Sequence, residues 1–282
     1  MSFGDRLSAA ISTYGHLCVG IDPHPGMLSE WGLSHDAAGL QEFGDRIIEA
    51  ASGRVGVVKP QVAFFENYGV PGMRALTEIM QSAREAGLLV IADAKRGDIG
   101  STMAAYASAW LNPEKDFGAD ALTVSPFLGF GSLEPAVDAA QEHSGGLFVL
   151  ALTSNPEGQA VQLAGADADA EAGGTVASDI VAQAAQVNRV ATDQAPLGSI
   201  GLVVGATTAH LAAEHGIDLT VGRPPILAPG YGAQGATAHQ VRSGFGAAWD
   251  QVLVSSSRGI LQAGPEVSEL IKVIDASCAD LE

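Results

Sequence analysis

Cysteine and long apolar runs are both scarce in this chain of 282 residues. The two cysteines, Cys18 and Cys278, stand near opposite ends, and no spacing of Cys and His is typical of a zinc site. No apolar run approaches the roughly 20 residues that a helix needs to cross a bilayer. The N-terminal segment lacks the basic and apolar regions of a signal peptide. These absences argue against a disulfide-linked secreted protein and a membrane protein, and we predict a cytoplasmic one.

Basic residues are also few. The chain has 14 Lys and Arg against 32 Asp and Glu, which gives a net charge of −18. Nucleic acid and anionic membranes would be repelled by such a chain, so neither is expected as a partner. An anionic substrate would need a locally cationic site. Each Lys or Arg at a strand end is therefore a stronger candidate for a substrate-binding residue.

Apolar segments of strand length recur along the chain, separated by segments with the apolar spacing of helices. The predicted strands are near-continuous apolar runs, which are typical of parallel strands buried on both faces. They cover residues 17–22, 55–61, 88–95, 121–127, 147–153, 201–206, 225–229 and 252–257. Between them, Phe43, Ile47 and Ile48 fall on one helical face, and residues 2–14 are predicted to form an extra helix before the first strand.

Eight β-α units in a chain of this length predict a (β/α)8 TIM barrel, with residues 1–282 forming a single domain and the extra helix at its N-terminus. A doubly wound open sheet is the alternative. The Gly-x-Gly-x-x-Gly dinucleotide fingerprint is absent after the first strand, which weakens that alternative. Residues 162–174, rich in Ala, Gly and Asp, are predicted to form a surface loop or insertion.

A charged run ends the third predicted strand. Asp93 and Lys95 are two positions apart, and alternate residues of a strand share a face, so we expect their side chains to lie side by side. A carboxylate and an ammonium are costly to desolvate at the end of a buried strand. Gly97 then breaks the strand, and Asp98 precedes a predicted helix at 99–111. The sequence therefore predicts catalytic groups at this strand-to-helix junction.

Other polar residues stand at the ends of the remaining predicted strands, where a barrel has its active site. Asp22 ends the first predicted strand and Lys59 lies in the second. The Gly-rich segments 229–235 and 255–259 begin at the ends of the seventh and eighth predicted strands, and such loops commonly bind phosphate in barrels. Arg258, in the second segment, could hold two phosphate oxygens at once.

Each of these residues also has an ordinary structural interpretation. Asp22 could be a turn residue before proline, Lys59 could extend its stem from a strand end, and Asp98 could be a helix N-cap. Arg258 could lie in a surface turn. Together, however, two lysines and three aspartates at one mouth of a barrel favour an active site.

Three segments resemble a known family. The run 93–102, DAKRGDIGST, resembles the D-x-K-x-x-D signature of orotidine 5′-phosphate decarboxylase. The segment 59–66, KPQVAFFE, resembles the second strand of its longer-chain bacterial branch, and 228–235, APGYGAQG, resembles its seventh-strand loop. The matches run in order from Asp22 to Arg258, so the resemblance covers nearly the whole chain.

The resemblance implies loss of CO2 from orotidine 5′-monophosphate to give uridine 5′-monophosphate, the last step of de novo pyrimidine nucleotide synthesis. It implies neither a metal nor an organic cofactor. Asp93 would face the departing carboxylate, Lys95 would protonate C6, and Lys59 would join their charged network. A fixed ammonium would stabilise the carbanion at C6, so Lys95 is expected to be buried and kept charged by Asp93 and Asp98.

The resemblance also implies substrate-binding residues and a partner. Asp22 would bind the ribose and Ser154 the pyrimidine. Gln234 and Arg258 would hold the phosphate, with Pro229 in the same loop region as Gln234. Asp98 and Thr102 would reach the partner's site across a homodimer interface. Many relatives have Gly before the phosphate-binding Arg, whereas Ser257 stands here.

Two other functions stay open at this point. Sugar-phosphate enzymes of the same fold that use Mg²⁺, such as 3-keto-gulonate 6-phosphate decarboxylase or hexulose phosphate synthase, share the D-x-K-x-x-D run. They would need an acidic metal ligand at the end of the second strand, where Lys59 would repel the ion. A non-catalytic nucleotide-binding barrel is the other alternative, but it would have little reason to retain both lysines and all three aspartates.

Overall fold

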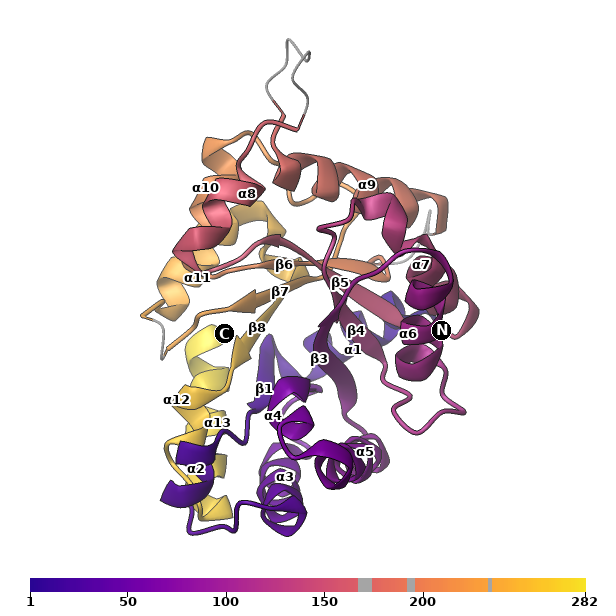
Figure 1. Ribbon diagram of the computed structural model, residues 1–282. Helices are drawn as coiled ribbons and strands as arrows, with labels where there is room; N and C mark the ends of the chain where they lie inside the picture. Colours follow the sequence, from indigo (N-terminus) through magenta and orange to yellow (C-terminus); the bar gives the residue numbers. More distant parts are fainter. Residues whose placement is uncertain (167–173, 192–195, 233–234) are drawn as a thin grey trace.

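Eight parallel strands form one closed barrel in chain order, so that β8 pairs with β1 (Figure 1). The computed structural model describes residues 1–166, 174–191, 196–232 and 235–282. The strands are β1 (Leu17–Ile21), β2 (Val57–Pro60), β3 (Leu89–Arg96), β4 (Ala121–Val124), β5 (Gly146–Leu152), β6 (Ile200–Val204), β7 (Ile226–Pro229) and β8 (Val252–Ser256). The predicted (β/α)8 barrel is confirmed, and each predicted strand overlaps an observed one.

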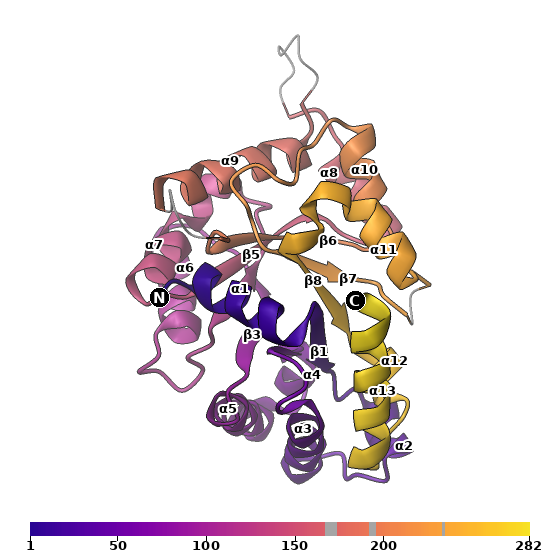
Figure 2. The ribbon, with the colours of Figure 1, turned by 180° about the vertical axis from the view of Figure 1, so that it is seen from behind.

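Helices surround the barrel, and Figures 1 and 2 show them from its two sides. The α-helices are α1 (Phe3–Tyr14), α2 (Pro25–Glu30), α3 (Ala37–Ala51), α4 (Val62–Glu66), α5 (Gly69–Glu85), α6 (Gly100–Leu111), α7 (Glu134–Glu142), α8 (Gln159–Gln162), α9 (Val176–Ala191), α10 (Ala209–Glu214), α11 (Ala238–Phe245), α12 (Arg258–Leu261) and α13 (Val267–Leu281). The 3-10 helices among the described residues are η1 (Phe130–Leu133), η2 (Pro156–Gly158) and η3 (Gly246–Gln251). None of these described helices is both long and apolar enough to cross a membrane. Of the predicted loop 162–174, residue 162 ends α8, whereas residues 167–173 lie outside the described residues.

The extra N-terminal helix is confirmed, and it covers one end of the barrel (Figure 2). Ser2 and Asp5 form a capping box, in which each side chain accepts a hydrogen bond from the backbone N–H of the other. Phe3 is fully buried and packs edge-on against Phe148 of β5, with ring centroids 6.0 Å apart. Because α1 covers the N-terminal ends of the strands, the carboxyl ends at the opposite side are left for a site.

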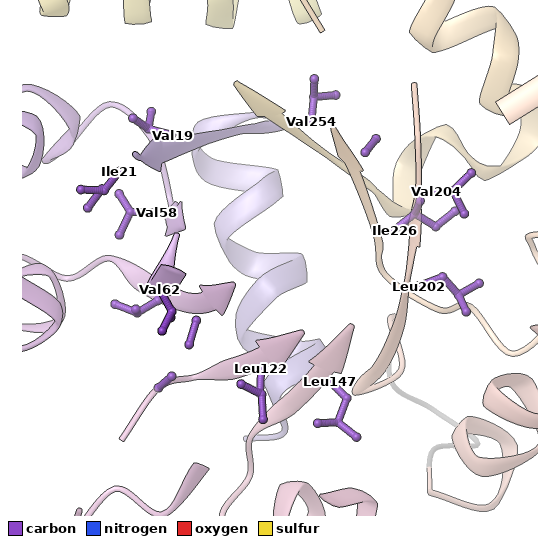
Figure 3. Close-up of a cluster of buried hydrophobic side chains, with 14 of the residues drawn as sticks. Val19, Ile21, Val58, Val62, Leu122, Leu147, Leu202, Val204, Ile226 and Val254 are labelled. Carbon is purple, nitrogen blue, oxygen red and sulfur yellow. The ribbon is translucent and has the colours of Figure 1, made fainter. Parts of the chain in front are cut away.

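Apolar side chains cover both faces of the strands. Val19, Val58, Leu122, Leu202 and Val254 point away from the barrel axis toward the helices (Figure 3). A second apolar cluster includes Cys18, Val57, Ile91, Phe148 and Leu253. The two clusters explain why the strands are near-continuous apolar runs. The few buried polar residues of the strands are therefore exceptions that need a chemical reason, and they include Lys59, Asp93 and Thr123.

Candidate active site

A cavity of about 610 Å³ opens at the carboxyl ends of the strands. The barrel brings to its wall residues that are far apart in the sequence, from all eight strands or the loops that follow them. Of the residues predicted from the sequence, the wall contains Asp22, Lys59, Asp93, Lys95, Ser154, Pro229 and Arg258.

Asp93 is the centre of a hydrogen-bonded charge network. Its Oδ2 accepts from Lys59 Nζ at 2.8 Å and from Gln61 Nε2 at 3.2 Å. Its Oδ1 accepts from Lys95 Nζ at 2.6 Å and from the Thr123 hydroxyl at 3.0 Å. Two cations and two neutral donors thus compensate for the desolvation of one buried carboxylate.

The network keeps its buried members charged. Burial by itself would raise the pKa of Asp93, but Lys59 and Lys95 outweigh it, and the pKa lies well below its usual range. Burial by itself would lower the pKa of Lys59, but Asp93 and Asp22 outweigh it, and the pKa lies above its usual range. At neutral pH both residues are ionised.

Lys95 lies at the open side of this network. Its side chain meets Asp93 as predicted, but it is 46% exposed, so the expectation that it is buried was wrong. The backbone explains the difference: Lys95 has a φ of 48°, in the left-handed region, and the β3–β4 register shifts between Ala92 and Arg96. The side chain therefore leaves an irregular strand end at the mouth of the cavity rather than a regular strand inside the barrel.

Asp22 and Ser257 join the loops that follow β1 and β8. The Ser257 hydroxyl donates to Asp22 Oδ2. Asp22 Oδ1 is buried and has no hydrogen-bond partner among the described residues, so it is an acceptor available to a ligand hydroxyl. Arg258, the next residue, begins α12, is exposed and lines the same cavity.

The loop after β7 contributes Pro229, Gly230 and Tyr231 to the cavity wall. The backbone N–H groups of Gly232, Gly235 and Ala236 donate to carbonyl groups of the same loop. The predicted phosphate residue Gln234 lies outside the described residues. Of the two residues predicted in this loop region, only Pro229 is among the described residues, and it lines the cavity.

Asp98 and Thr102 do not line the cavity of their own chain. Asp98 Oδ1 accepts the backbone N–H of Ile99 at 2.8 Å, and Thr102 is exposed on α6. The alternative interpretation of Asp98 as an N-cap was wrong: α6 begins at Gly100, and Ile99 occupies the N-cap position without a side-chain cap. Of the five charged residues grouped by the sequence, four meet at this cavity.

Several cavity residues were missed from the sequence, namely Gln61, Thr123, His24 and Phe64. His24 caps α2 by accepting the Met27 N–H at Nδ1, 3.2 Å away. The only available signals were a hydroxyl between Leu122 and Val124 in an apolar run and an amide two residues after Lys59. Across the described part of the chain, no group of three or more His, Cys, Asp or Glu is placed to hold a metal ion.

Comparisons with known proteins agree with this geometry. Residues 15–273 match the family described as orotidine 5′-phosphate decarboxylase / HUMPS. An orotidine 5′-phosphate decarboxylase of Salinispora arenicola is 52% identical over 280 residues, which cover 99% of this chain and 96% of that one. The enzyme of that name from Streptomyces coelicolor is 50% identical over 279 residues, with the same coverage.

Solved structures are similar over the same length. A Streptomyces avermitilis crystal structure assigned as an orotidine 5′-phosphate decarboxylase has a TM-score of 0.92 and 49% identity, and the match covers 99% of this chain and 94% of that one. The Leishmania donovani OMP decarboxylase has a TM-score of 0.78 and 28% identity, with coverage of 100% and 98%.

Proposed function

The chain belongs to the orotidine 5′-phosphate decarboxylase / HUMPS family, and from this premise we propose how its cavity works. The chain is a carboxy-lyase that converts orotidine 5′-monophosphate to uridine 5′-monophosphate and CO2, the last step of pyrimidine nucleotide synthesis. The observation that carries the proposed mechanism is the Lys59–Asp93–Lys95 network on the cavity wall. The Mg²⁺-dependent alternative would need an acidic ligand at the end of β2, where the buried Lys59 stands.

The chemical step uses the two groups that face each other across 2.6 Å, Asp93 and Lys95. When the C6–carboxylate bond breaks, CO2 leaves and the electron pair stays on C6. The Lys95 ammonium stabilises this developing charge and then transfers its proton to C6. Asp93 faces the substrate carboxylate, and their repulsion is relieved as CO2 departs. Lys59 keeps Asp93 ionised throughout.

Substrate binding uses the other side of the cavity. Asp22 Oδ1, which is buried and unpartnered among the described residues, accepts a ribose hydroxyl. Arg258 binds the phosphate through two oxygens, and Pro229 and Gln234 belong to the neighbouring phosphate loop. Ser154, in the loop after β5, contacts the pyrimidine. Binding energy from the phosphate, remote from C6, helps to hold the ring against Lys95.

The proposal includes a homodimer with shared sites. Asp98 and Thr102 stand outside their own cavity, which supports their entry into the partner's cavity. Ile99, directly after Asp98, is 61% exposed, and Phe127 and Leu128 in the loop after β4 are also exposed apolar residues. Such apolar groups are suited to an interface between two copies. We also propose that residues 1–282 form one domain and that the enzyme acts in the cytoplasm.

Replacement of Lys95 tests the mechanism. Lys95→Ala removes the proton donor and the cation nearest to C6, and kcat should fall by at least about 10⁴-fold, the product of the two effects at their usual minimum. The assay is the loss of substrate absorbance, with binding of uridine 5′-monophosphate as evidence that the variant is folded. The matched control is Lys272→Ala on α13, where Lys272 pairs only with Glu269 among the described residues, and it should leave kcat unchanged. Near-normal turnover by a folded Lys95→Ala protein would refute the mechanism.

A further inference from the structure

We infer that Thr123 is a positioning residue. Its single hydroxyl fixes the position of both the Lys95 backbone and the Asp93 carboxylate. The inference rests on the proposed function, because these positions matter only if Lys95 and Asp93 act on the substrate. Thr123 lies in β4, is 1% exposed and borders the cavity.

The direction of the hydroxyl is set by its two partners. Thr123 Oγ1 accepts the backbone N–H of Lys95 at 2.9 Å and donates to Asp93 Oδ1 at 3.0 Å. An amide N–H can only donate and an ionised carboxylate can only accept, so the hydroxyl proton must point at Asp93. A side chain without both functions cannot connect these two groups.

The first connection supports an unusual backbone. Lys95 has a φ of 48°, which a residue with a Cβ seldom adopts without support from its surroundings. It lies where the β3–β4 register is irregular, between the pairs Ala92–Leu122 and Arg96–Val124. The hydroxyl of Thr123, from the neighbouring strand, binds the N–H of Lys95 at this point. It therefore helps to direct the Lys95 side chain into the cavity.

The second connection holds Asp93 when Lys95 acts. Asp93 Oδ2 accepts hydrogen bonds from Lys59, which lies in β2, and from Gln61, the residue directly after β2. Oδ1 is held by Lys95 Nζ, whose side chain is half exposed, and by Thr123. Lys95 must turn to C6 to give up its proton, and Thr123 is then the remaining described donor to Oδ1. Its hydroxyl thus fixes the carboxylate during the step in which Lys95 moves.

Packing alone does not require a hydroxyl at this position. Valine has nearly the same shape as threonine and is favoured in strands, so Thr123→Val keeps the volume and removes only the hydrogen bonds. Serine and alanine form a second pair that differs by the same hydroxyl. Comparison of Thr with Val and of Ser with Ala therefore isolates the hydroxyl twice, in two different packing contexts.

The experiment measures kcat and KM for orotidine 5′-monophosphate, together with the Kd for uridine 5′-monophosphate, in wild type and the three variants. In each pair, kcat should fall between about tenfold and a hundredfold when the hydroxyl is lost, the usual effect of removing a hydrogen bond to a charged group. KM and Kd should stay within a factor of about three, because Thr123 acts through Asp93 and Lys95 rather than on the substrate. Thr123→Ser should retain most of the wild-type kcat.

Three results would overturn the inference. The first is Thr123→Val turning over like wild type. The second is a rise in KM and Kd with kcat unchanged, which would make Thr123 a substrate contact. The third is equal kcat in the Ser and Ala variants, and this pair decides the question if Thr123→Val does not fold. Absence of decarboxylation by the wild type would instead refute the proposed function, and this inference with it.

Discussion

Asp93 and Lys59 illustrate what burial demands of a single charged residue. Neither could stay ionised alone inside a barrel, and each is held charged by the other and by its neighbours. The pKa of Asp93 lies below its unfolded value of about 3.9 and that of Lys59 above its unfolded value of about 10.4. The stabilisation from Asp93 is therefore present above about pH 4, and that from Lys59 below about pH 10. Between these limits Asp93 and Lys59 should both be charged.

Asp93→Asn should destabilise the fold in a pH-dependent way. At pH 7 the free energy of unfolding should fall by about 3–5 kcal/mol, because the buried Lys59 ammonium loses the carboxylate to which it is hydrogen-bonded. Since the pKa of Asp93 is lower in the folded state, wild type loses this advantage as the pH falls below about 4. The difference between the two proteins should then shrink. Urea denaturation followed by circular dichroism at pH 7, 5 and 3 measures it.

The control for this prediction is Asp116→Asn, which changes an exposed aspartate in the loop after α6. It should shift the free energy of unfolding by no more than about 0.5 kcal/mol at any of these pH values. A difference between wild type and Asp93→Asn that grows in acid would contradict the proposed ionisation of Asp93.

Among the elements, the loops after β1 and β8 depend on each other. The barrel closes between these two strands, with Val19 opposite Ser256 in the register, so that residues from the two ends of the chain share one wall of the cavity. Gly20 makes the contact possible. A Cβ at position 20 would lie 2.1 Å from Ser257 Oγ and 2.8 Å from Ser257 Cβ. The small residue in β1 thus leaves room for the bond between Ser257 and Asp22.

Gly20→Ala should therefore weaken substrate binding. Its methyl group displaces Ser257 from Asp22 and shifts the adjacent Arg258, so KM should rise between about tenfold and a hundredfold through weaker charge-assisted contacts. The value of kcat should change less, because Lys95 and Asp93 lie on other strands. Steady-state kinetics with orotidine 5′-monophosphate provides the measurement. Gly131→Ala is the control, because a Cβ at that position meets nothing within 4 Å, and an unchanged KM in folded Gly20→Ala would remove the proposed role of this wall.

On the scale of the whole molecule, the net charge requires cations to be gathered at the cavity, and the exposed surface beside Asp98 is suited to a partner chain. A chain of net charge −18 must gather cations to bind an anionic nucleotide, and Lys59, Lys95 and Arg258 meet at one cavity. Asp98 stands outside that cavity, beside the exposed Ile99. In the proposed dimer each cavity is completed by the partner, which makes the dimer itself the catalytic unit.

Mixed dimers test the shared site. Lys95→Ala and Asp98→Ala homodimers should both be nearly inactive, because every site has one defect. A mixed dimer has one site with both defects and one with neither. Random pairing of equal amounts makes roughly half of the dimers mixed, so about a quarter of wild-type activity should return. The measurement is decarboxylase activity after co-expression of the two variants with different affinity tags.

Two observations control this test. Tandem purification through both tags confirms that mixed dimers form, and a mixture of Lys95→Ala with tagged Lys95→Ala should stay inactive. If tandem-purified mixed dimers show no activity, then Asp98 acts within its own chain or on the fold, and the shared site is ruled out.

The sequence by itself determined the architecture and the charged residues of the cavity wall. Continuous apolar runs such as 147–153 specify strands buried on both faces. A polar residue at the carboxyl end of such a run is therefore expected at the mouth of the barrel. Asp22, Lys59, Asp93, Lys95 and Arg258 were placed in this way, and the family resemblance added Ser154 and Pro229. These features depend on local patterns, which a single sequence contains.

Tertiary structure alone decided how these residues are held. Thr123 and Gln61 contact Asp93 because neighbouring strands place them opposite it. The register between two strands cannot be predicted from the sequence of either strand alone. The left-handed Lys95 and the register shift beside it placed its side chain at the open mouth rather than in the core. Asp98, five residues from Asp93, turned away from the cavity where the chain enters α6. Contacts across strands and irregular backbone are properties of the packed barrel, and for that reason only the folded chain reveals them.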